Sequence, residues 1–208
     1  RVPVIEGSNH DEWRLFVAQQ ELVSGALTPA QYPGAIASTL RIPLAQANAL
    51  AIFVYPLAAY PSPSVALGAL GTDAIFACNA RTASGLLSQF APTFAYEFND
   101  PNAPQRFLPP VSFPSGAYHA SELQYLFDLQ TPEPSPGFTP DQQALAATMV
   151  QYWTNFAKRG DPNGAEPPTW QGYTVASDQH QSLVPAGVAP ITTFGADHKC
   201  NFWVPLLP

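Results

Sequence analysis

One histidine, His119, has the sequence surroundings of a catalytic base. It follows small residues in the stretch SGAYHASELQYLFDL (115–129), and Glu122 and an apolar, aromatic run come after it. This pattern predicts a short exposed loop that leads into a packed segment. Imidazole titrates near neutral pH, so His119 could take up and return a proton there. The pattern also fits a partly buried histidine without a catalytic role.

Two carboxylates near the start of the chain could orient such a histidine. Residues 2–5 are an apolar, β-branched run that predicts a buried parallel strand, and Asp11 and Glu12 follow in the next turn. In open α/β sheets the reacting groups gather beyond the carboxyl ends of the strands, so both acids are well placed. Glu12 is also typical of a solvated carboxylate at the start of a helix. Their neighbour His10 is not expected to be essential.

A histidine and a buried acid can together perform acyl transfer. The imidazole takes the proton of a nucleophile, and the carboxylate holds the imidazole in the productive tautomer. In α/β-hydrolases the serine comes first, on a GxSxG elbow, followed by the acid and the histidine. No serine in this chain has a glycine two residues before it, and Met149 is the only methionine. We therefore expect a processed or cut piece, with the serine and the oxyanion loop on sequence before Arg1.

Two predicted strands place the acid and the base on one edge of a sheet. Residues 92–98, PTFAYEF, alternate and are rich in aromatics, which predicts a second strand that a turn at 99–101 ends. The loop after this strand leads to His119, as the turn after the first strand leads to Glu12. Both candidates therefore follow strands.

Three helices are predicted to support these strands. Residues 15–23 indicate a short helix, and residues 72–87 indicate a second one that Thr72 and Asp73 open. Residues 139–159 have the strongest pattern, with a capping threonine, proline at the first helical position and an aromatic stripe. We expect this third helix to brace the histidine loop. The alanine-rich region 28–63, cut by prolines, predicts an insertion that lines a gorge or lid.

The composition describes one globular unit with few charges. Of 208 residues, 46% are hydrophobic and 11% are charged, against roughly 25% charged in an average soluble domain. The 24 prolines predict many turns, including a proline-rich surface connection at 131–140. A net charge of −7 without a basic run argues against nucleic acid and anionic membranes as partners. No stretch of the sequence is long and apolar enough to span a membrane. The substrate is expected to be a small molecule.

Two cysteines, Cys78 and Cys200, permit one disulfide but do not require it, because two buried free thiols would fit the same sequence. A zinc site made from His198 and Cys200 is not expected, because two ligands do not make a tetrahedral site and no second pair stands nearby. The sequence therefore indicates no metal site and no other cofactor.

Several segments resemble the type B carboxylesterase and cholinesterase family, and they follow that family's order. The stretch 115–129 resembles its catalytic-histidine loop, and VPVIEGSNHDEWRLF (2–16) resembles its acid-bearing segment. YWTNFAKRGDPN (152–163) with PTWQGY (168–173) resembles the helix and loop near its end, and CNFW (200–203) its closing cysteine segment. These segments cover nearly the whole chain.

The resemblance implies an α/β fold, with residues 1–208 as the C-terminal part of a single α/β-hydrolase catalytic domain. Its mostly parallel sheet would be flanked by helices. The resemblance also implies carboxylic ester hydrolysis by a Ser-His-Glu triad, in which Glu12, rather than Asp11, is the acid and His119 the base. Trp13 stands where the family more often has glycine, which alters the turn and the pocket beside it.

The resemblance further implies that Cys78 and Cys200 form a disulfide bridging the C-terminal half, and hence a secreted, extracellular or periplasmic location. The expected partner is the N-terminal fragment of the same enzyme, which would carry the serine. A rival function is a cholinesterase-like extracellular adhesion module without catalysis. Such modules typically lack part of the triad, so the presence of Glu12 and His119 favours the enzyme.

Overall fold

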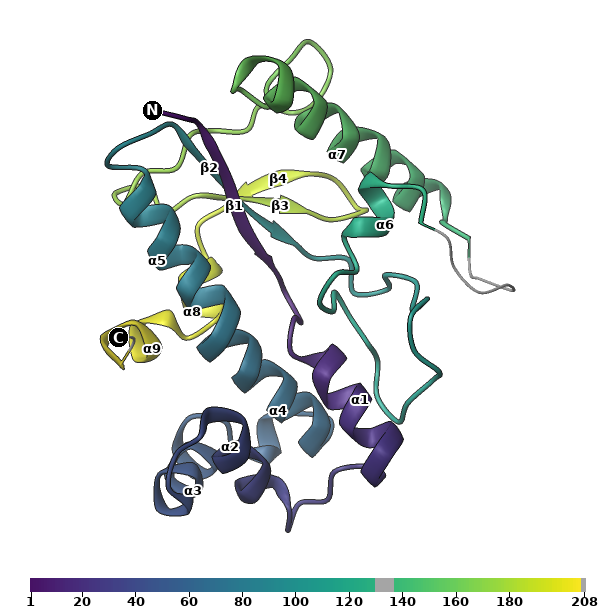
Figure 1. The fold of residues 1–208 in the computed structure, drawn as a ribbon, viewed down its shortest axis with the longest axis vertical. Helices are drawn as coiled ribbons and strands as arrows, with labels where there is room; N and C mark the ends of the chain where they lie inside the picture. Colours follow the sequence, from purple (N-terminus) through teal and green to yellow (C-terminus); the bar gives the residue numbers. More distant parts are fainter. Residues whose placement is uncertain (130–136, 207–208) are drawn as a thin grey trace.

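A four-stranded mixed sheet forms the centre of the structure, a computed structural model that describes residues 1–129 and 137–206. Its strands are β1 (Val4–Asn9), β2 (Thr93–Phe98), β3 (His180–Leu183) and β4 (Ala189–Ile191), in spatial order β1-β2-β3-β4. The first three strands are parallel and β4 pairs antiparallel with β3. The predicted α/β class is therefore confirmed, with helices on both sides of the sheet (Figure 1).

The strand predicted at residues 2–5 begins and ends later, at Val4 and Asn9. Its polar second half stays in the sheet because each residue from Gly7 to Asn9 pairs with the parallel strand β2. Gly7 is required there, since a Cβ would lie 2.4 Å from the Tyr96 ring. The prediction stopped at this glycine because glycine weakens isolated strands. The strand predicted at 92–98 is confirmed, starting at Thr93.

Helices make up about half of the rest of the described chain. The longer ones are α1 (Arg14–Ser24), α2 (Tyr32–Leu40), α3 (Leu44–Phe53), α4 (Pro63–Gly71), α5 (Cys78–Leu87) and α7 (Pro140–Arg159). Short helices are η1 (Leu57–Ala59), α6 (Leu123–Leu126), α8 (Phe194–Asp197), α9 (Cys200–Trp203) and η3 (Val204–Leu206). In Figure 1 the sheet lies between α7 and the rod formed by α4 and α5, while α1 to α3 lie at one end.

The helix predicted to begin at Thr72 belongs to a helical segment that begins nine residues earlier, at Pro63. The prediction that Thr72 and Asp73 open the helix was therefore wrong. Ser62 caps α4 by accepting a hydrogen bond from the backbone N–H of Val65 (3.3 Å). The chain then continues through the π-helix η2 (Thr72–Ala77) into α5. Thr72 donates its hydroxyl to the carbonyl of Gly68 (2.8 Å) inside this helix instead of capping it. The glycines before Thr72 hid the continuation, because glycine is a poor helix former.

The helix predicted at 139–159 is confirmed together with its caps. The Thr139 hydroxyl accepts from the backbone N–H of Gln142 (3.3 Å), whose side chain accepts from the backbone N–H of Thr139 (2.9 Å). Gly160 ends α7 in the left-handed region, at φ 71°. The prediction for 15–23 is also confirmed, by α1. Of the proline-rich connection predicted at 131–140, residues 131–136 lie outside the described part of the chain.

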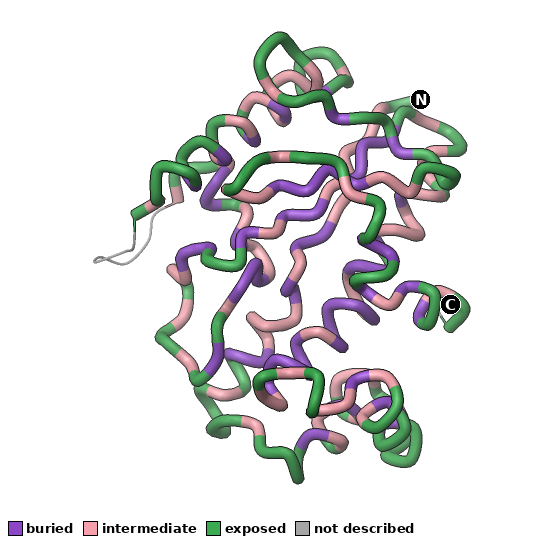
Figure 2. Tube along the Cα trace, turned by 180° about the vertical axis from the view of Figure 1, so that it is seen from behind, coloured by how far each residue is buried: buried purple, intermediate pink, exposed green. Residues whose placement is uncertain are grey.

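Two apolar clusters hold these elements together. One lies between the sheet and α7 and contains Phe94, Phe98, Met149 and Tyr152. Tyr118, the neighbour of His119, belongs to the same cluster, and α6 contacts α7, so the long helix braces the histidine loop as expected. The other cluster packs α1 to α4 together and extends to Phe113 and to Trp203 in α9. Figure 2 shows buried residues along the strands and exposed residues along the outer loops.

Strand β2 separates two environments because successive side chains point to opposite faces of a sheet. Phe94 and Phe98 lie on the α7 face, whereas Glu97 lies on the other face and contacts His198.

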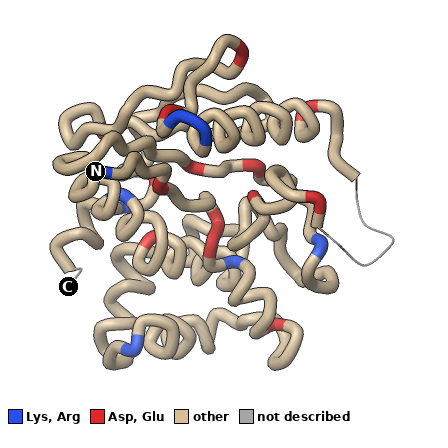
Figure 3. The backbone as a smooth tube through the Cα atoms, turned by 45° about the horizontal axis from the view of Figure 1, so that its top comes forward, with Lys and Arg blue, Asp and Glu red and all other residues tan. Residues whose placement is uncertain are grey.

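Charged side chains are sparse on most elements, and Figure 3 shows the Lys and Arg residues scattered over the described chain. Among the described helices, none alone has the length and apolarity to cross a membrane; α2 and α3 meet that test only as a pair bent by 115°.

A disulfide joins Cys78, the first residue of α5, to Cys200, the first residue of α9. The two positions are 122 residues apart, so the bond restricts the unfolded chain strongly. We expect reduction, or the double change Cys78→Ala and Cys200→Ala, to lower the unfolding free energy by up to about 5 kcal/mol. Denaturant titration of the protein expressed from its complete reading frame measures this. Reductant should leave the double variant unchanged, and equal stability of oxidised and reduced wild type would contradict the prediction.

Candidate active site

The carboxylate of Glu12 is held rigidly just beyond the carboxyl end of β1. The residue is 6% exposed, and its Oε1 accepts a hydrogen bond from the backbone N–H of Asn9 (2.8 Å). The Ser8 hydroxyl lies 3.5 Å from the same oxygen. These contacts leave Oε2 for a further partner, which is His119.

His119 Nδ1 lies 2.6 Å from Glu12 Oε2. A carboxylate can only accept, so the hydrogen is on Nδ1 and the other ring nitrogen, Nε2, carries the lone pair. The two backbones are also joined, since the N–H of His119 donates to the carbonyl of Glu12 (3.3 Å). The His119 side chain is 43% exposed, against 8% for that of Glu12. The pair therefore has a buried acid and an accessible base.

Asp11, the competing acid, is directed elsewhere. Its Oδ1 lies 2.9 Å from Arg14 Nη2, and its Oδ2 accepts from the backbone N–H of Ala117 (3.0 Å). Gly116 adopts φ 62°, and a Cβ there would lie 2.1 Å from Asp11 Oδ2. Asp11 thus fixes the loop that carries His119 without touching its ring. Of these two adjacent carboxylates, Glu12 contacts the His119 ring, whereas Asp11 contacts Arg14 and the backbone of Ala117.

A third acid, Glu122, lies beneath the histidine loop. The side-chain amide of Asn9 donates hydrogen bonds both to Glu122 Oε2 and to the backbone carbonyl of Tyr118 (2.9 Å). Burial raises the pKa of Glu122 above the usual range of a carboxyl. Sequence reasoning noticed Glu122 only as a neighbour of His119 in the chain, and its contact with Asn9 depends on the packing of the two loops.

The hydrogen bond to Glu12 raises the pKa of His119 above its usual 6.5, although partial burial opposes the charge. The negative charges of Glu12 and Glu122 act in the same direction as the hydrogen bond. An imidazole with a raised pKa is a stronger proton acceptor, and its protonated form is stabilised by a fixed counter-charge. This arrangement suits a general base that must carry a proton for part of a reaction.

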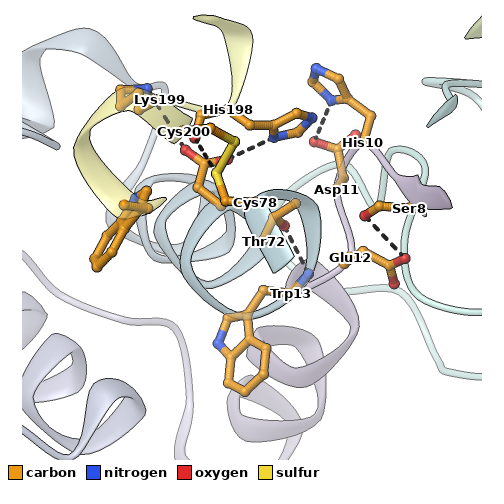
Figure 4. Close-up of polar contacts among 12 residues, drawn as sticks. Ser8, His10, Asp11, Glu12, Trp13, Thr72, Cys78, His198, Lys199 and Cys200 are labelled. Atoms are coloured by element: carbon orange, nitrogen blue, oxygen red, sulfur yellow. Dashed lines mark hydrogen bonds and ion pairs between the residues drawn. A yellow bond between two sulfur atoms is a disulfide. The ribbon is translucent and has the colours of Figure 1, made fainter. Parts of the chain in front are cut away.

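Aromatic rings line one side of His119. The ring centroids of Phe16 and Phe76 lie 5.5 and 5.2 Å from that of His119, and Trp13 lies 4.5 Å from Phe16. Trp13 fits because its ring packs on Gly71, where a Cβ would lie 2.1 Å from the indole. Its backbone N–H donates to the Thr72 hydroxyl (3.0 Å), as Figure 4 shows. The unusual tryptophan thus extends an apolar wall beside the histidine.

The described residues supply no nucleophile to this pair. In residues 1–129 and 137–206 the only hydrogen-bond partner of the His119 ring is Glu12. Ser8 approaches Glu12 but has no contact with the histidine. Within the described residues, the site therefore pairs one acid with one histidine.

Two other histidines are buried away from this pair. His180 stacks on Phe194 at 4.0 Å, and burial lowers the pKa of its imidazole to about 4. His198 lies between the carboxylates of Asp73 and Glu97. Burial opposes a charge on His198, but the two carboxylates raise its pKa to about 9. The zinc pair His198 and Cys200, which the sequence did not favour, is not formed, because Cys200 is in the disulfide.

An acid and a histidine in the loops that follow neighbouring parallel strands are the arrangement of an α/β-hydrolase site. A family model described as the carboxylesterase family matches residues 45–203. That range is well over half of the chain, and it includes His119, whereas Glu12 lies before it. The chain belongs to the carboxylesterase family, whose fold agrees with the mixed sheet and flanking helices.

Curated relatives match shorter parts of the chain. Human bile salt-activated lipase is 39% identical over 96 residues, which is 45% of this chain and 12% of the relative. Human cocaine esterase is 28% identical over 138 residues, covering 65% of this chain and 23% of the relative. Chicken acetylcholinesterase is 31% identical over 96 residues, covering 45% and 12%. The chain thus spans less than a quarter of the length of these relatives.

The contact with Glu12 leads to a prediction about the titration of His119. We expect Glu12→Gln to lower the pKa of His119, because it removes the largest cause of the upward shift. Glu122→Gln should lower it less, since Glu122 acts only through its more distant charge. Two-dimensional NMR of the imidazole carbon-bound protons across a pH series measures both changes. An unchanged His119 titration in Glu12→Gln would show that the hydrogen bond does not form in solution.

Proposed function

We propose that this chain contributes the acid and the histidine to a Ser-His-Glu triad that hydrolyses carboxylic esters. The observation that carries the proposal is the 2.6 Å contact between His119 Nδ1 and Glu12 Oε2, which joins a buried acid to an accessible imidazole. Membership of the carboxylesterase family supports ester hydrolysis in general. Relatives named as a lipase and an esterase support an ester as the substrate class.

In this mechanism His119 carries one proton in each half of the reaction. Its Nε2 takes the proton of the serine hydroxyl while the serine oxygen bonds to the acyl carbon, and Glu12 stabilises the imidazolium that forms. The imidazolium then gives the proton to the alcohol oxygen as the ester C–O bond breaks. In the second half, water gives a proton to His119 as its oxygen bonds to the acyl carbon, and that proton passes to the serine oxygen as the acyl–serine bond breaks and the acid leaves. Phe16 and Phe76, beside the His119 ring, would offer apolar contact to the substrate.

The serine and the oxyanion donors are proposed to lie on an N-terminal segment of the same enzyme, which makes residues 1–208 the C-terminal part of one catalytic domain. Strand β1 supports this, because only one of its edges is paired within the described residues. An open parallel edge favours pairing with a further strand. The small share of each relative that the chain spans agrees with a larger enzyme.

A secreted or extracellular location is proposed for this enzyme. The disulfide between Cys78 and Cys200 supports it, because disulfides persist in oxidising compartments. The rival function, a non-catalytic adhesion module, would not need a buried acid aligned on an exposed histidine. The paired geometry of Glu12 and His119 favours the enzyme.

Replacement of the pair should abolish most of the activity. In the protein expressed from its complete reading frame, we expect His119→Ala and Glu12→Gln each to lower kcat on a small activated ester by about 10³-fold or more. The histidine change removes the proton carrier, and the glutamate change removes its orientation and counter-charge.

A matched control is Glu166→Gln, which makes the same chemical change at an exposed glutamate whose only side-chain hydrogen bond within the described residues is with Gln151. It should keep kcat and KM near the wild-type values. Circular dichroism of all three variants establishes that they are folded. Near-normal turnover by a folded His119→Ala enzyme would contradict the proposed role of His119 as the general base.

The segment carrying the serine can be tested by dividing the protein. We expect residues 1–208 alone to lack esterase activity, because the described residues place no nucleophile at His119. Co-expression with the upstream segment as a separate chain should restore activity and solubility, since β1 then pairs at its open edge. Ester hydrolysis by the isolated chain that disappears in His119→Ala would show that the nucleophile lies within these residues.

A further inference from the structure

A second cluster of titratable side chains lies near the carboxyl ends of β1 and β2. His10 follows β1, Glu97 is in β2, and His198 follows α8. One ring nitrogen of each histidine and one carboxylate oxygen all lie within 4.8 Å of one another. Figure 4 shows the rings of His10 and His198 close together, with Asp11 beside His10 and the disulfide on the other side of His198. This cluster does not include the Glu12 and His119 pair.

His198 has one more acceptor around it than a neutral imidazole can satisfy. Its Nδ1 lies 2.7 Å from Asp73 Oδ1, and its Nε2 lies 2.9 Å from Glu97 Oε1. Asp73 and Glu97 are only 3% and 2% exposed, so water does not replace either contact. A neutral imidazole has a single N–H. One of its two nitrogens therefore needs a further cation, which is either a second proton or a metal ion.

The surroundings of His198 determine which nitrogen is available. Asp73 is fixed by one hydrogen bond and one ion pair of its own, because the Tyr55 hydroxyl donates to its Oδ2 (2.7 Å) and Lys199 Nζ lies 4.0 Å from the same oxygen. Asp73 therefore holds the Nδ1–H of His198, and Nε2 faces Glu97. At metal centres, a histidine that binds the metal through one nitrogen commonly donates the N–H of its other nitrogen to a carboxylate, which orients the ring. Asp73 is placed to do this for His198.

His10 completes the set from the opposite side. Its Nδ1 lies 3.2 Å from Asp11 Oδ1, and Asp11 is itself fixed by Arg14 and by the backbone of Ala117. The His10 ring is thereby kept beside the cluster, although its side chain is 38% exposed. That exposure gives an ion a path of entry and gives the ring room to adjust.

We propose that His10, Glu97 and His198 bind one divalent transition-metal ion of the zinc type, with water completing the coordination. Two imidazoles and one carboxylate are a donor set that Zn²⁺ accepts, whereas Ca²⁺ and Mg²⁺ require mainly oxygen ligands. Bonds of about 2.0 to 2.1 Å in a tetrahedron place ligand atoms about 3.3 Å apart. The 2.9 Å between His198 Nε2 and Glu97 Oε1 is close to that spacing, and the His10 ring needs only to close on the ion.

The bound ion would join three distant parts of the chain. It would link the turn after β1, strand β2, and the segment that leads into the disulfide at Cys200. His10 is two residues before Glu12, so the ion would also restrain the turn that carries Glu12. Because the unfolded chain does not bring these ligands together, binding would stabilise the folded state.

The test uses the protein expressed from its complete reading frame, and its readouts do not depend on esterase activity. After treatment with EDTA, incubation with Zn²⁺ and gel filtration, we expect one zinc per chain by elemental analysis and a higher melting temperature than for the stripped protein. Substitution with Co²⁺ should give visible absorption bands of a histidine-bound ion. His10→Ala should weaken zinc binding by more than the roughly 10–100-fold that loss of an outer partner costs.

His119→Ala is the matched control, because it removes another partly exposed histidine, which lies outside the proposed metal site, and should keep the zinc. Glu97→Gln should also lose the ion, and its circular dichroism shows whether it folds; if it does not fold, His10→Ala and the Co²⁺ spectrum decide. A wild-type protein that retains no zinc above the buffer level overturns the proposal. Zinc that is retained equally by His10→Ala overturns it as well, since the ion then lies elsewhere.

Discussion

The parallel pairing of β1 with β2 is the constraint on which the site depends. Its register runs from Val4 opposite Thr93 to Asn9 opposite Phe98, so both strands end at the same level. The turn with Glu12 and the loop with His119 leave the sheet from this edge. Their backbones then join at Asp11 with Ala117 and at Glu12 with His119. A slip of the register would move the acid away from the base, however well each loop were formed.

The same strand ends serve two different clusters because side chains alternate along a strand. Glu97 points to one face, where it meets His198, while Phe98 points to the opposite face, which α7 covers. The two clusters are neighbours in the turn after β1, where His10 belongs to one and Glu12 to the other. Each cluster thus contains a buried carboxylate, Glu12 in one and Glu97 in the other.

The sequence predicted those features that local residue types determine. The capping box at Thr139 and the glycine at 160 define α7 completely, and the aromatic alternation at 92–98 defines β2. The acid and the histidine could be named because they follow strands and resemble a family pattern. The choice of Glu12 over Asp11 needed that resemblance, since nothing local distinguishes two adjacent carboxylates.

What the sequence could not predict depends on contacts between distant residues. The continuation of α4 into α5 uses glycines that pack against Arg14 and Trp13, and local propensity reads these glycines as breaks. His10, Glu97 and His198 have no spacing that marks them as a group, so no motif could assemble them. Asp73 looked like a helix-capping residue, yet it lies inside a helix and contacts His198.

The separation of β1 and β2 in the chain also governs the order in which the molecule can fold. Helices α2 and α3 contact each other and are adjacent in the sequence, so this pair can form early. The strand pair must instead close a long loop, and the entropy of that closure is lost before the pairing returns any free energy. We therefore expect the acid and the histidine to meet late, after this helical pair has formed. A newly made chain would then pass through a compact state without a site, in which the edge of β2 is still open to other chains.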